Sequence, residues 1–258
     1  MKGFSLEGRR AVVTGASRGL GMYMARALSR AGAELIVTAR DRERCNPIVD
    51  ELRRVGRKVT AYDLDVRVQE SISHFVRSVL DENGFVDILV NNAGMNIRKP
   101  FLDFTWEEWD TIIETNLRSC FFVTQSFARS MMERRYGRVI NIGSVTSVFG
   151  YAGIVPYCAS RGGVLQMTRG LADELGPYGI TVNCLAPGWF KTAQNTALYE
   201  NREWLEYIID RIPLKRPGKP DDLDGPIVFL ASEASAYISG QIMLVDGGIT
   251  TGATKATV

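Results

Sequence analysis

The stretch "RRAVVTGASRGLG" (9–21) decides the fold of this chain. Its first part, "RRAVVTG" (9–15), is a short apolar run that ends in glycine, which predicts a buried strand. Its last part opens a segment, 19–31, in which apolar residues recur at helical spacing. The glycines Gly15, Gly19 and Gly21 follow the pattern G-x-x-x-G-x-G. The stretch therefore predicts a strand, a tight turn and a helix in direct succession.

The rest of the chain continues this alternation of strand and helix. Amphipathic segments separate the apolar runs, and the two longest lie at about 105–135 and 155–177. This order predicts βαβ units and an α/β fold: a single Rossmann-type, doubly wound, mainly parallel seven-stranded sheet with helices on both faces. We find no linker, so residues 1–258 are expected to form one domain. The other predicted strands are 33–39, 58–65, 85–94, 137–144, 180–188 and 241–248.

One segment, at about 189–213, interrupts the alternation. It follows a predicted strand and carries aromatic residues such as Trp189 and Trp204 among polar ones. Open α/β sheets bind their ligands beyond the carboxyl ends of the strands. We therefore expect this segment to form a lid over a substrate.

Composition excludes several classes of protein. The net charge of +2 gives no indication of binding to nucleic acid, and 45% hydrophobic residues are typical of a globular protein. No apolar run reaches the roughly 18 residues that a membrane span needs, and "MKGFSLEGRR" (1–10) lacks the apolar core of a signal peptide. The four cysteines lie far apart and are expected to be free thiols in the reducing cytoplasm.

The only histidine, His74, lies in a predicted amphipathic helix. With no second histidine and no Cys-x-x-Cys pair, the chain offers no ligand set for a catalytic zinc ion. We therefore predict no metal site, and we expect His74 to be an ordinary helix residue.

The glycine-rich turn, 14–21, suits a dinucleotide. Glycines let the main chain approach a pyrophosphate, and the N-terminus of the following helix offers free N–H groups. After the second strand, proteins that use NAD carry an acidic residue for the ribose 2′-hydroxyl. This chain has Arg40 there and a second cation, Arg18, inside the turn. Either both are solvated surface arginines or they bind a 2′-phosphate, and we predict the second role and hence NADP(H).

A series of short motifs runs through the chain in a fixed order. They are "TGASRGLG" (14–21), "DLDV" (63–66), "NNAG" (91–94), Asn116 in "ETNL", Ser144 in "NIGS", Tyr157 in "YCASR", "PGWFKT" (187–192) and "VDGG" (245–248). Together they make essentially the whole chain resemble the short-chain dehydrogenase/reductase family. The resemblance is closest to gluconate 5-dehydrogenases and 3-oxoacyl-carrier-protein reductases, and "NIRKPF" (96–101) and "TAQNTAL" (192–198) favour the gluconate group.

The resemblance implies which residues contact the cofactor. In the family the first motif binds the pyrophosphate, and the aspartate that matches Asp65 contacts adenine. Asn91 supports the sheet beside the cofactor pocket, and Thr192 borders the nicotinamide carboxamide. The implied cofactor-binding residues are Gly15, Ser17, Arg18, Gly19, Leu20, Gly21, Arg40, Asp65, Val66, Asn92, Ala93, Gly94, Tyr157, Arg161, Pro187, Gly188, Phe190 and Thr192.

The resemblance also implies a catalytic set, Asn116, Ser144, Tyr157 and Arg161. In it the tyrosine is the general acid for reduction of a carbonyl and the base for oxidation of an alcohol. The serine holds the carbonyl oxygen by a hydrogen bond, and the asparagine fixes a water or a main-chain group of a proton relay. The reaction is hydride transfer between NADP(H) and a small carbonyl or alcohol substrate.

Arg161 departs from the family, which has lysine at this position. A tyrosine is a poor base at neutral pH, and a cation one helical turn away favours its ionised form. Arginine keeps the charge, but its guanidinium is broader and does not release its proton. Three explanations stay open: the arginine suffices for activity, the protein binds NADP(H) without catalysis, or the residue is a deliberate substitution that slows turnover.

The substrate is expected to be a secondary alcohol or ketone, such as the sugar acid pair gluconate and 5-ketogluconate. Arg98, Lys99 and Lys191 follow predicted strands, where one of them could meet a carboxylate, although all three could equally be solvated. The alternatives are reduction of a 3-oxoacyl thioester and a weakly active or non-catalytic NADP(H)-binding protein.

The segment 155–177 carries more apolar residues than one sheet face needs, which predicts a homotetramer or homodimer. These residues are Val164, Leu165, Met167, Leu171 and Leu175.

Overall fold

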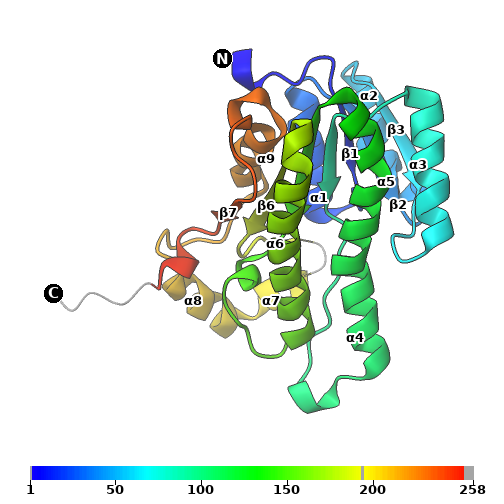
Figure 1. Ribbon diagram of the computed structural model, residues 1–258. Helices are drawn as coiled ribbons and strands as arrows, with labels where there is room; N and C mark the ends of the chain where they lie inside the picture. The colour runs from blue at the N-terminus through cyan, green and yellow to red at the C-terminus, as the bar shows by residue number, and fades with distance from the viewer. Residues whose placement is uncertain (1, 193–194, 253–258) are drawn as a thin grey trace.

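The computed structural model describes residues 2–192 and 195–252. The strands within these ranges are β1 (Arg10–Val13), β2 (Glu34–Ala39), β3 (Val59–Asp63), β4 (Ile88–Asn91), β5 (Gly137–Ile142), β6 (Ile180–Pro187) and β7 (Ile242–Val245). All seven are parallel and form one sheet in the order β3-β2-β1-β4-β5-β6-β7 (Figure 1), which confirms the predicted fold class. The order reverses between β1 and β4, so the loops after these two strands diverge at the carboxyl edge of the sheet.

Helices cover both faces of the sheet. One face carries α1 (Gly19–Arg30), α2 (Asn46–Arg54) and α9 (Asp224–Ala231). The other carries α3 (Gln69–Asn83), α5 (Ser119–Arg134) and the end of α6 (Val155–Leu175). The remaining helices are α4 (Trp106–Ile113), α7 (Thr196–Glu200) and α8 (Arg202–Arg211), which Figure 1 shows beyond the carboxyl ends of the strands.

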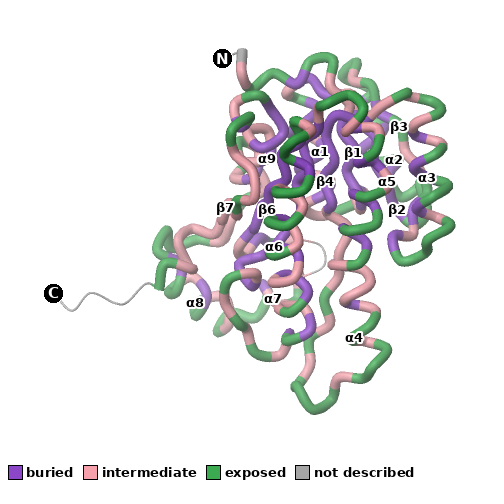
Figure 2. The backbone as a smooth tube through the Cα atoms, viewed as in Figure 1, coloured by how far each residue is buried: buried purple, intermediate pink, exposed green. Residues whose placement is uncertain are grey.

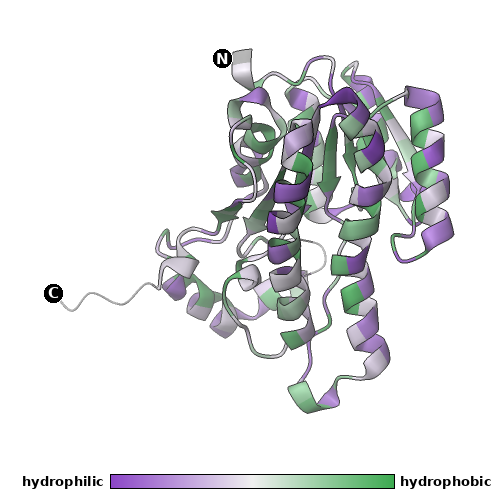
Figure 3. Ribbon diagram, in the orientation of Figure 1, coloured by the Kyte–Doolittle hydropathy of each residue, from purple (hydrophilic) through white to green (hydrophobic). Residues whose placement is uncertain are grey.

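The core lies on both sides of the sheet. In β1, Val12 packs with the α3 and α5 side chains, while Ala11 and Val13 pack with those of α1. Every residue of β5 and β6 is buried, and Figures 2 and 3 show a buried, hydrophobic centre. Strands covered on both faces have apolar side chains in both directions. For this reason continuous apolar runs located the strands correctly.

The predicted helix over 105–135 is interrupted. It consists of α4, a π-helical turn (Glu114–Arg118) and α5 in direct succession. A π-helical turn inserts one wider turn into a helix and leaves the apolar periodicity on either side nearly unchanged. Periodicity alone therefore did not predict it. Asn116 lies in this turn and is fully buried.

The four cysteines are free. Burial raises the pKa of the Cys45 and Cys120 thiols to about 11 and that of Cys184 to about 12. These thiols are therefore protonated near neutral pH and are not nucleophiles. Among the described helices, none is long and apolar enough to cross a membrane.

The apolar residues of α6 are mostly used within the chain itself. Val164, Leu165 and Leu175 are buried against its own core, so they do not form the free surface from which assembly was predicted. Large exposed apolar side chains lie instead just before and within α4. Leu102 and Trp106, for example, are 88% and 83% exposed.

Candidate active site

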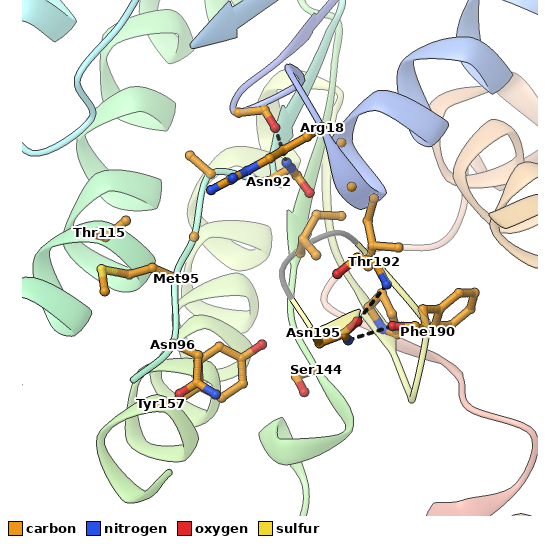
Figure 4. Close-up of a pocket in the computed structure, with 18 of the residues that line it drawn as sticks. Arg18, Asn92, Met95, Asn96, Thr115, Ser144, Tyr157, Phe190, Thr192 and Asn195 are labelled. Carbon is orange, nitrogen blue, oxygen red and sulfur yellow. Dashed lines mark hydrogen bonds between the residues drawn. The ribbon is translucent and has the colours of Figure 1, made fainter. Parts of the chain in front are cut away.

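A large cavity of about 1420 Å³ lies at the carboxyl edge of the sheet (Figure 4). The loops after β1 to β6 all contribute to its wall. Of the predicted site residues, all but Asn116 line it. They are Gly15, Ser17, Arg18, Gly19, Leu20, Gly21, Arg40, Asp65, Val66, Asn92, Ala93, Gly94, Ser144, Tyr157, Arg161, Pro187, Gly188, Phe190 and Thr192.

The glycine-rich turn after β1 has a conformation that only glycines allow at several positions. Gly15 and Gly19 have φ angles of +65° and +61°, which other residues rarely adopt. A Cβ on Gly21 would lie 2.6 Å from the carbonyl oxygen of Gly15. The turn is also bound to the loop after β4, because Asn92 Nδ2 donates hydrogen bonds to the carbonyls of Thr14 (2.8 Å) and Gly15 (3.1 Å).

Arg18 and Arg40, the cations predicted to bind the 2′-phosphate, are not engaged in ion pairs with the described residues. Within the described ranges, neither Arg18 nor Arg40 lies within 4.0 Å of a carboxylate. Both line the cavity, and Arg18 precedes the first residue of α1. Two free guanidinium groups beside a helix N-terminus suit a phosphate group.

Two further arginines, Arg44 and Arg67, line the same end of the cavity, and the sequence reasoning missed them. Arg44 lies 3.9 Å from the carboxylate of Asp41, and Arg67 lies 3.6 Å from that of Asp65. Arg44 follows the end of β2 by a few residues, and Arg67 follows the end of β3 in the same way. This short distance in sequence is the signal that could have placed them at the cavity.

Ser144 follows β5 and is oriented by the main chain. Its Oγ accepts a hydrogen bond from the N–H of Thr146 at 3.1 Å, and the residue is 8% exposed. Among the described residues, no acceptor takes the proton of its hydroxyl group. Ser144 can therefore donate a hydrogen bond to an oxygen atom in the cavity.

Tyr157 and Arg161 lie one helical turn apart near the start of α6, as their spacing predicted. The guanidinium carbon of Arg161 is 5.0 Å from the centre of the Tyr157 ring, a cation–π arrangement. Figure 4 shows Tyr157 and Ser144 at the same end of the cavity. A hydrogen-bond donor, a phenol and a cation thus meet where a carbonyl group could be protonated.

Arg161 is 5% exposed and has no carboxylate within 4.0 Å among the residues that the structure describes. One terminal nitrogen donates a hydrogen bond to the carbonyl of Ile142 at 2.6 Å, and Nε has no partner. The other terminal nitrogen lies against Gly94, where a Cβ would collide with it. An uncompensated buried charge is costly, which is typical of a site that receives a polar or anionic ligand.

Asn116 lies behind the cavity wall. Its Oδ1 accepts a hydrogen bond from the N–H of Met95 at 2.8 Å, and its Nδ2 donates to the carbonyl of Met95 at 2.9 Å. Nδ2 also donates to Ser160 Oγ at 3.1 Å. Asn116 thus holds the main chain of Met95, which does line the cavity.

Of the three cations considered for a substrate carboxylate, only Arg98 lines the cavity. Its guanidinium carbon lies 5.3 Å from the centre of the Tyr151 ring. Lys99 is engaged in an ion pair of 2.7 Å with Glu108, and Lys191 is exposed outside the cavity lining.

An aromatic cluster connects the 189–213 segment to the body of the protein. Trp189 packs edge-on against Tyr151 and Trp204, and Trp204 packs against Tyr199, with each pair of ring centres 5.3 Å apart. Trp204 Nε1 also donates a hydrogen bond to Tyr151 Oη at 3.4 Å.

Several other residues of the wall, from both loops and helices, were not named from the sequence. They are Met95, Asn96, Thr111, Thr115, Thr146, Ile154, Asn195, Ala197, Leu198 and Asn201.

His74 is exposed on α3 and does not line this cavity. Within residues 2–192 and 195–252, no group of three or more histidine, cysteine, aspartate or glutamate side chains could hold a metal ion.

Comparisons with known proteins agree with this geometry. A family model described as Enoyl-(Acyl carrier protein) reductase matches residues 15–250. The chain is 40% identical to gluconate 5-dehydrogenase of Gluconobacter oxydans over 247 residues, which cover 96% of each chain. It is also 40% identical to a 3-oxoacyl-[acyl-carrier-protein] reductase of Vibrio cholerae, over 95% of this chain and 98% of the relative.

Among solved structures, the chain is similar to a gluconate 5-dehydrogenase from Burkholderia cenocepacia in complex with NADP and tartrate. The TM-score is 0.94 at 37% identity, over 97% of this chain and 98% of the other. The family model and the full-length relatives bear out the resemblance drawn from the motifs, and the chain belongs to the short-chain dehydrogenase/reductase family of oxidoreductases.

Proposed function

We propose that this protein uses NADP(H) to interconvert a ketone and a secondary alcohol on a sugar acid, such as 5-ketogluconate and gluconate. The observation that carries the proposal is the meeting of the free Ser144 hydroxyl, the Tyr157 phenol and the buried Arg161 cation in one cavity. The gluconate-acting relatives, which match over nearly the whole chain, support the choice of substrate.

The two hydroxyl groups have distinct roles in the proposed reaction. Ser144 donates a hydrogen bond to the carbonyl oxygen and holds it in place. Tyr157 transfers its phenolic proton to that oxygen as the alcohol forms, and it accepts the proton in the reverse direction. NADPH, when bound, supplies the hydride to the carbonyl carbon.

The residues that line the cavity suit NADP(H). Gly15, Gly19 and the N-terminus of α1 suit the pyrophosphate, and the unpaired Arg18 and Arg40 suit the 2′-phosphate. Pro187, at the end of β6, and Gly188 and Thr192, after it, line the cavity, and we assign them to the nicotinamide. Asn116 is assigned to the catalytic set as the group that fixes the Met95 main chain.

Arg98 is the group that we assign to the substrate carboxylate. It lines the cavity, and the Tyr151 ring beneath it leaves its hydrogen-bond donors available. Lys99 is already paired with Glu108, and this pairing argues against the same role for it.

The test is NADPH oxidation with a panel of carbonyl compounds. We expect 5-ketogluconate to be reduced faster than a neutral keto sugar of the same length, because the neutral sugar lacks the carboxylate for Arg98. If the protein prefers a 3-oxoacyl thioester, that thioester and not a sugar acid is its substrate. NADPH binding without turnover of any ketone would identify a non-catalytic protein.

The protein is assigned to the cytoplasm because its cysteines are unpaired and mostly buried. Cell fractionation tests this, and recovery from an oxidising compartment would contradict it.

Arg40 is expected to select NADPH. Arg40→Asp should lower NADPH affinity by about 10- to 100-fold, because it removes charge-assisted hydrogen bonds worth roughly 1.5–3 kcal/mol, and should leave NADH affinity equal or higher. Fluorescence titration of both cofactors measures this. Arg42→Asp is the matched control, since Arg42 is exposed, pairs with Asp63 and does not line the cavity. Equal affinity of the unaltered protein for both cofactors would refute the role of Arg40.

Arg161 is expected to be a slower substitute for lysine. Arg161→Lys should raise kcat with an accepted ketone by up to about 100-fold, because the narrower side chain leaves the ribose more room beside Tyr157. It should also lower the free energy of unfolding by about 1–2 kcal/mol, because the Ile142 carbonyl loses its donor.

The measurements for Arg161→Lys are pH–rate profiles and denaturant unfolding. Arg161→Met is the control that keeps length and removes charge, and it should be slower than the unaltered protein. The same rate and pH midpoint in the arginine and lysine proteins would show that shape is unimportant here.

Assembly into a homodimer or homotetramer is proposed from the exposed apolar side chains around α4, such as Leu102 and Trp106. Light scattering at micromolar concentration should give the mass of two or four chains. The mass of a single chain would refute this proposal.

The 189–213 segment is proposed as the substrate lid of a single domain that spans 1–258. In the described part of the segment, Tyr199 of α7 and Trp204 of α8 belong to the aromatic cluster, and Ala197 and Leu198 of α7 line the cavity. Amide exchange in α7 and α8 should slow when NADPH and a ketone are bound together. Exchange that does not change on saturation would indicate a rigid insert.

A further inference from the structure

The side chain of Asn195 makes two of the hydrogen bonds that hold the main chain after β6 at the cavity, and the carbonyl of Thr192 also accepts one from Thr196 Oγ1 at 3.1 Å. Asn195 Oδ1 accepts a hydrogen bond from the N–H of Thr192 at 2.7 Å, and Asn195 Nδ2 donates to the carbonyl of Phe190 at 2.8 Å (Figure 4). The amide group of Asn195 therefore bonds a main-chain donor and a main-chain acceptor at once. Asn195 itself lines the cavity.

The neighbouring residues of this loop are held by other contacts. The carbonyl of Trp189 accepts a hydrogen bond from the N–H of Gly218 at 2.8 Å, and the Phe190 ring packs directly on Gly218. The N–H of Thr192 has no such support. Within the described part of the chain, its partner is the side chain of Asn195.

Asn195 makes these bonds in place of the one expected at its position. It precedes the first residue of α7, where an asparagine side chain ordinarily accepts a hydrogen bond from the second or third N–H of the helix. No such capping bond is present at α7. By contrast, Asn201 holds the same position before α8 and does cap it, through the N–H of Trp204 at 2.9 Å.

We infer that Asn195 is a positioning residue for the reaction: it sets Thr192 at the nicotinamide side of the cavity. This inference rests on the proposed function, in which Thr192 borders the nicotinamide. Asn195 also joins this loop to α7, so the start of the lid and the wall at Thr192 are expected to move together. A displacement of about 1 Å in such a wall can lower the rate on the order of 100-fold.

The experiment compares Asn195→Ala with Asn195→Asp. The alanine variant lacks both hydrogen bonds, so amide exchange at Thr192 should become at least about 10-fold faster in the protein without cofactor. Its kcat with the accepted ketone should fall by about 10- to 100-fold, and the isotope effect with 4-deuterated NADPH should rise as hydride transfer becomes limiting. Aspartate still accepts from the Thr192 N–H, so it should restore the protection of that amide and part of kcat.

Asn201→Ala is the matched control for loss of a residue at the start of a lid helix. It should speed exchange at Trp204 and leave the Thr192 amide protected. Unchanged exchange at Thr192 in Asn195→Ala, or an unchanged kcat and isotope effect, would overturn the inference while the proposed function stands. If the unaltered protein reduces no ketone, the proposed function fails, and with it the catalytic role of Asn195, whether or not the exchange data confirm the contact.

Discussion

The charge of Arg161 is buried without a counter-charge among the residues that the structure describes, and the arrangement of the cavity follows from that constraint. The residue is 5% exposed, and its nearest compensation is the Ile142 carbonyl and the face of the Tyr157 ring. A guanidinium is more weakly hydrated than an ammonium group, so its burial costs less. Arginine can therefore lie at the carboxyl ends of β4 and β5, where it bonds the carbonyl of Ile142 in β5 and lies against Gly94 in the loop after β4.

The loop after β4 is built to accept this side chain. Gly94 has to lack a Cβ because a terminal nitrogen of Arg161 occupies that space. The next residue, Met95, is fixed through both its N–H and its carbonyl by Asn116 from the π-helical turn. The π-helical turn, the loop and α6 thus form one unit around the guanidinium. This unit explains why a fully buried asparagine lies behind the cavity without reaching it.

The sequence predicted the sheet well because the central strands are buried and are rich in apolar residues, although the edge strands β3 and β7 are only partly buried. The sequence also identified the site residues at the ends of β1, β4 and β5. A residue that directly follows a parallel strand must lie at the carboxyl edge of the sheet, where the cavity is. The π-helical turn was missed because it does not disturb the apolar pattern. Arg44, Arg67 and Asn195 were missed because their contacts depend on the course of loops. Val164, Leu165 and Leu175 of α6 were wrongly assigned to an assembly surface. Apolar content alone does not reveal whether a side chain is covered by its own chain or by another.

Both halves of the cavity are held by an asparagine side chain that bonds the main chain, but the two asparagines join different elements. The loops after β1 and β4 are joined by Asn92, which bonds the carbonyls of Thr14 and Gly15. Groups fixed in this way need no reorganisation when a phosphate binds, which favours a constant cofactor site. The loop after β6 is held in part by the side chain of Asn195, which precedes the first residue of α7, and it continues into α7 and α8. A wall that has to admit and release a substrate must be able to separate from the sheet. Support from a side chain gives such a wall one defined resting position without making it part of the rigid core.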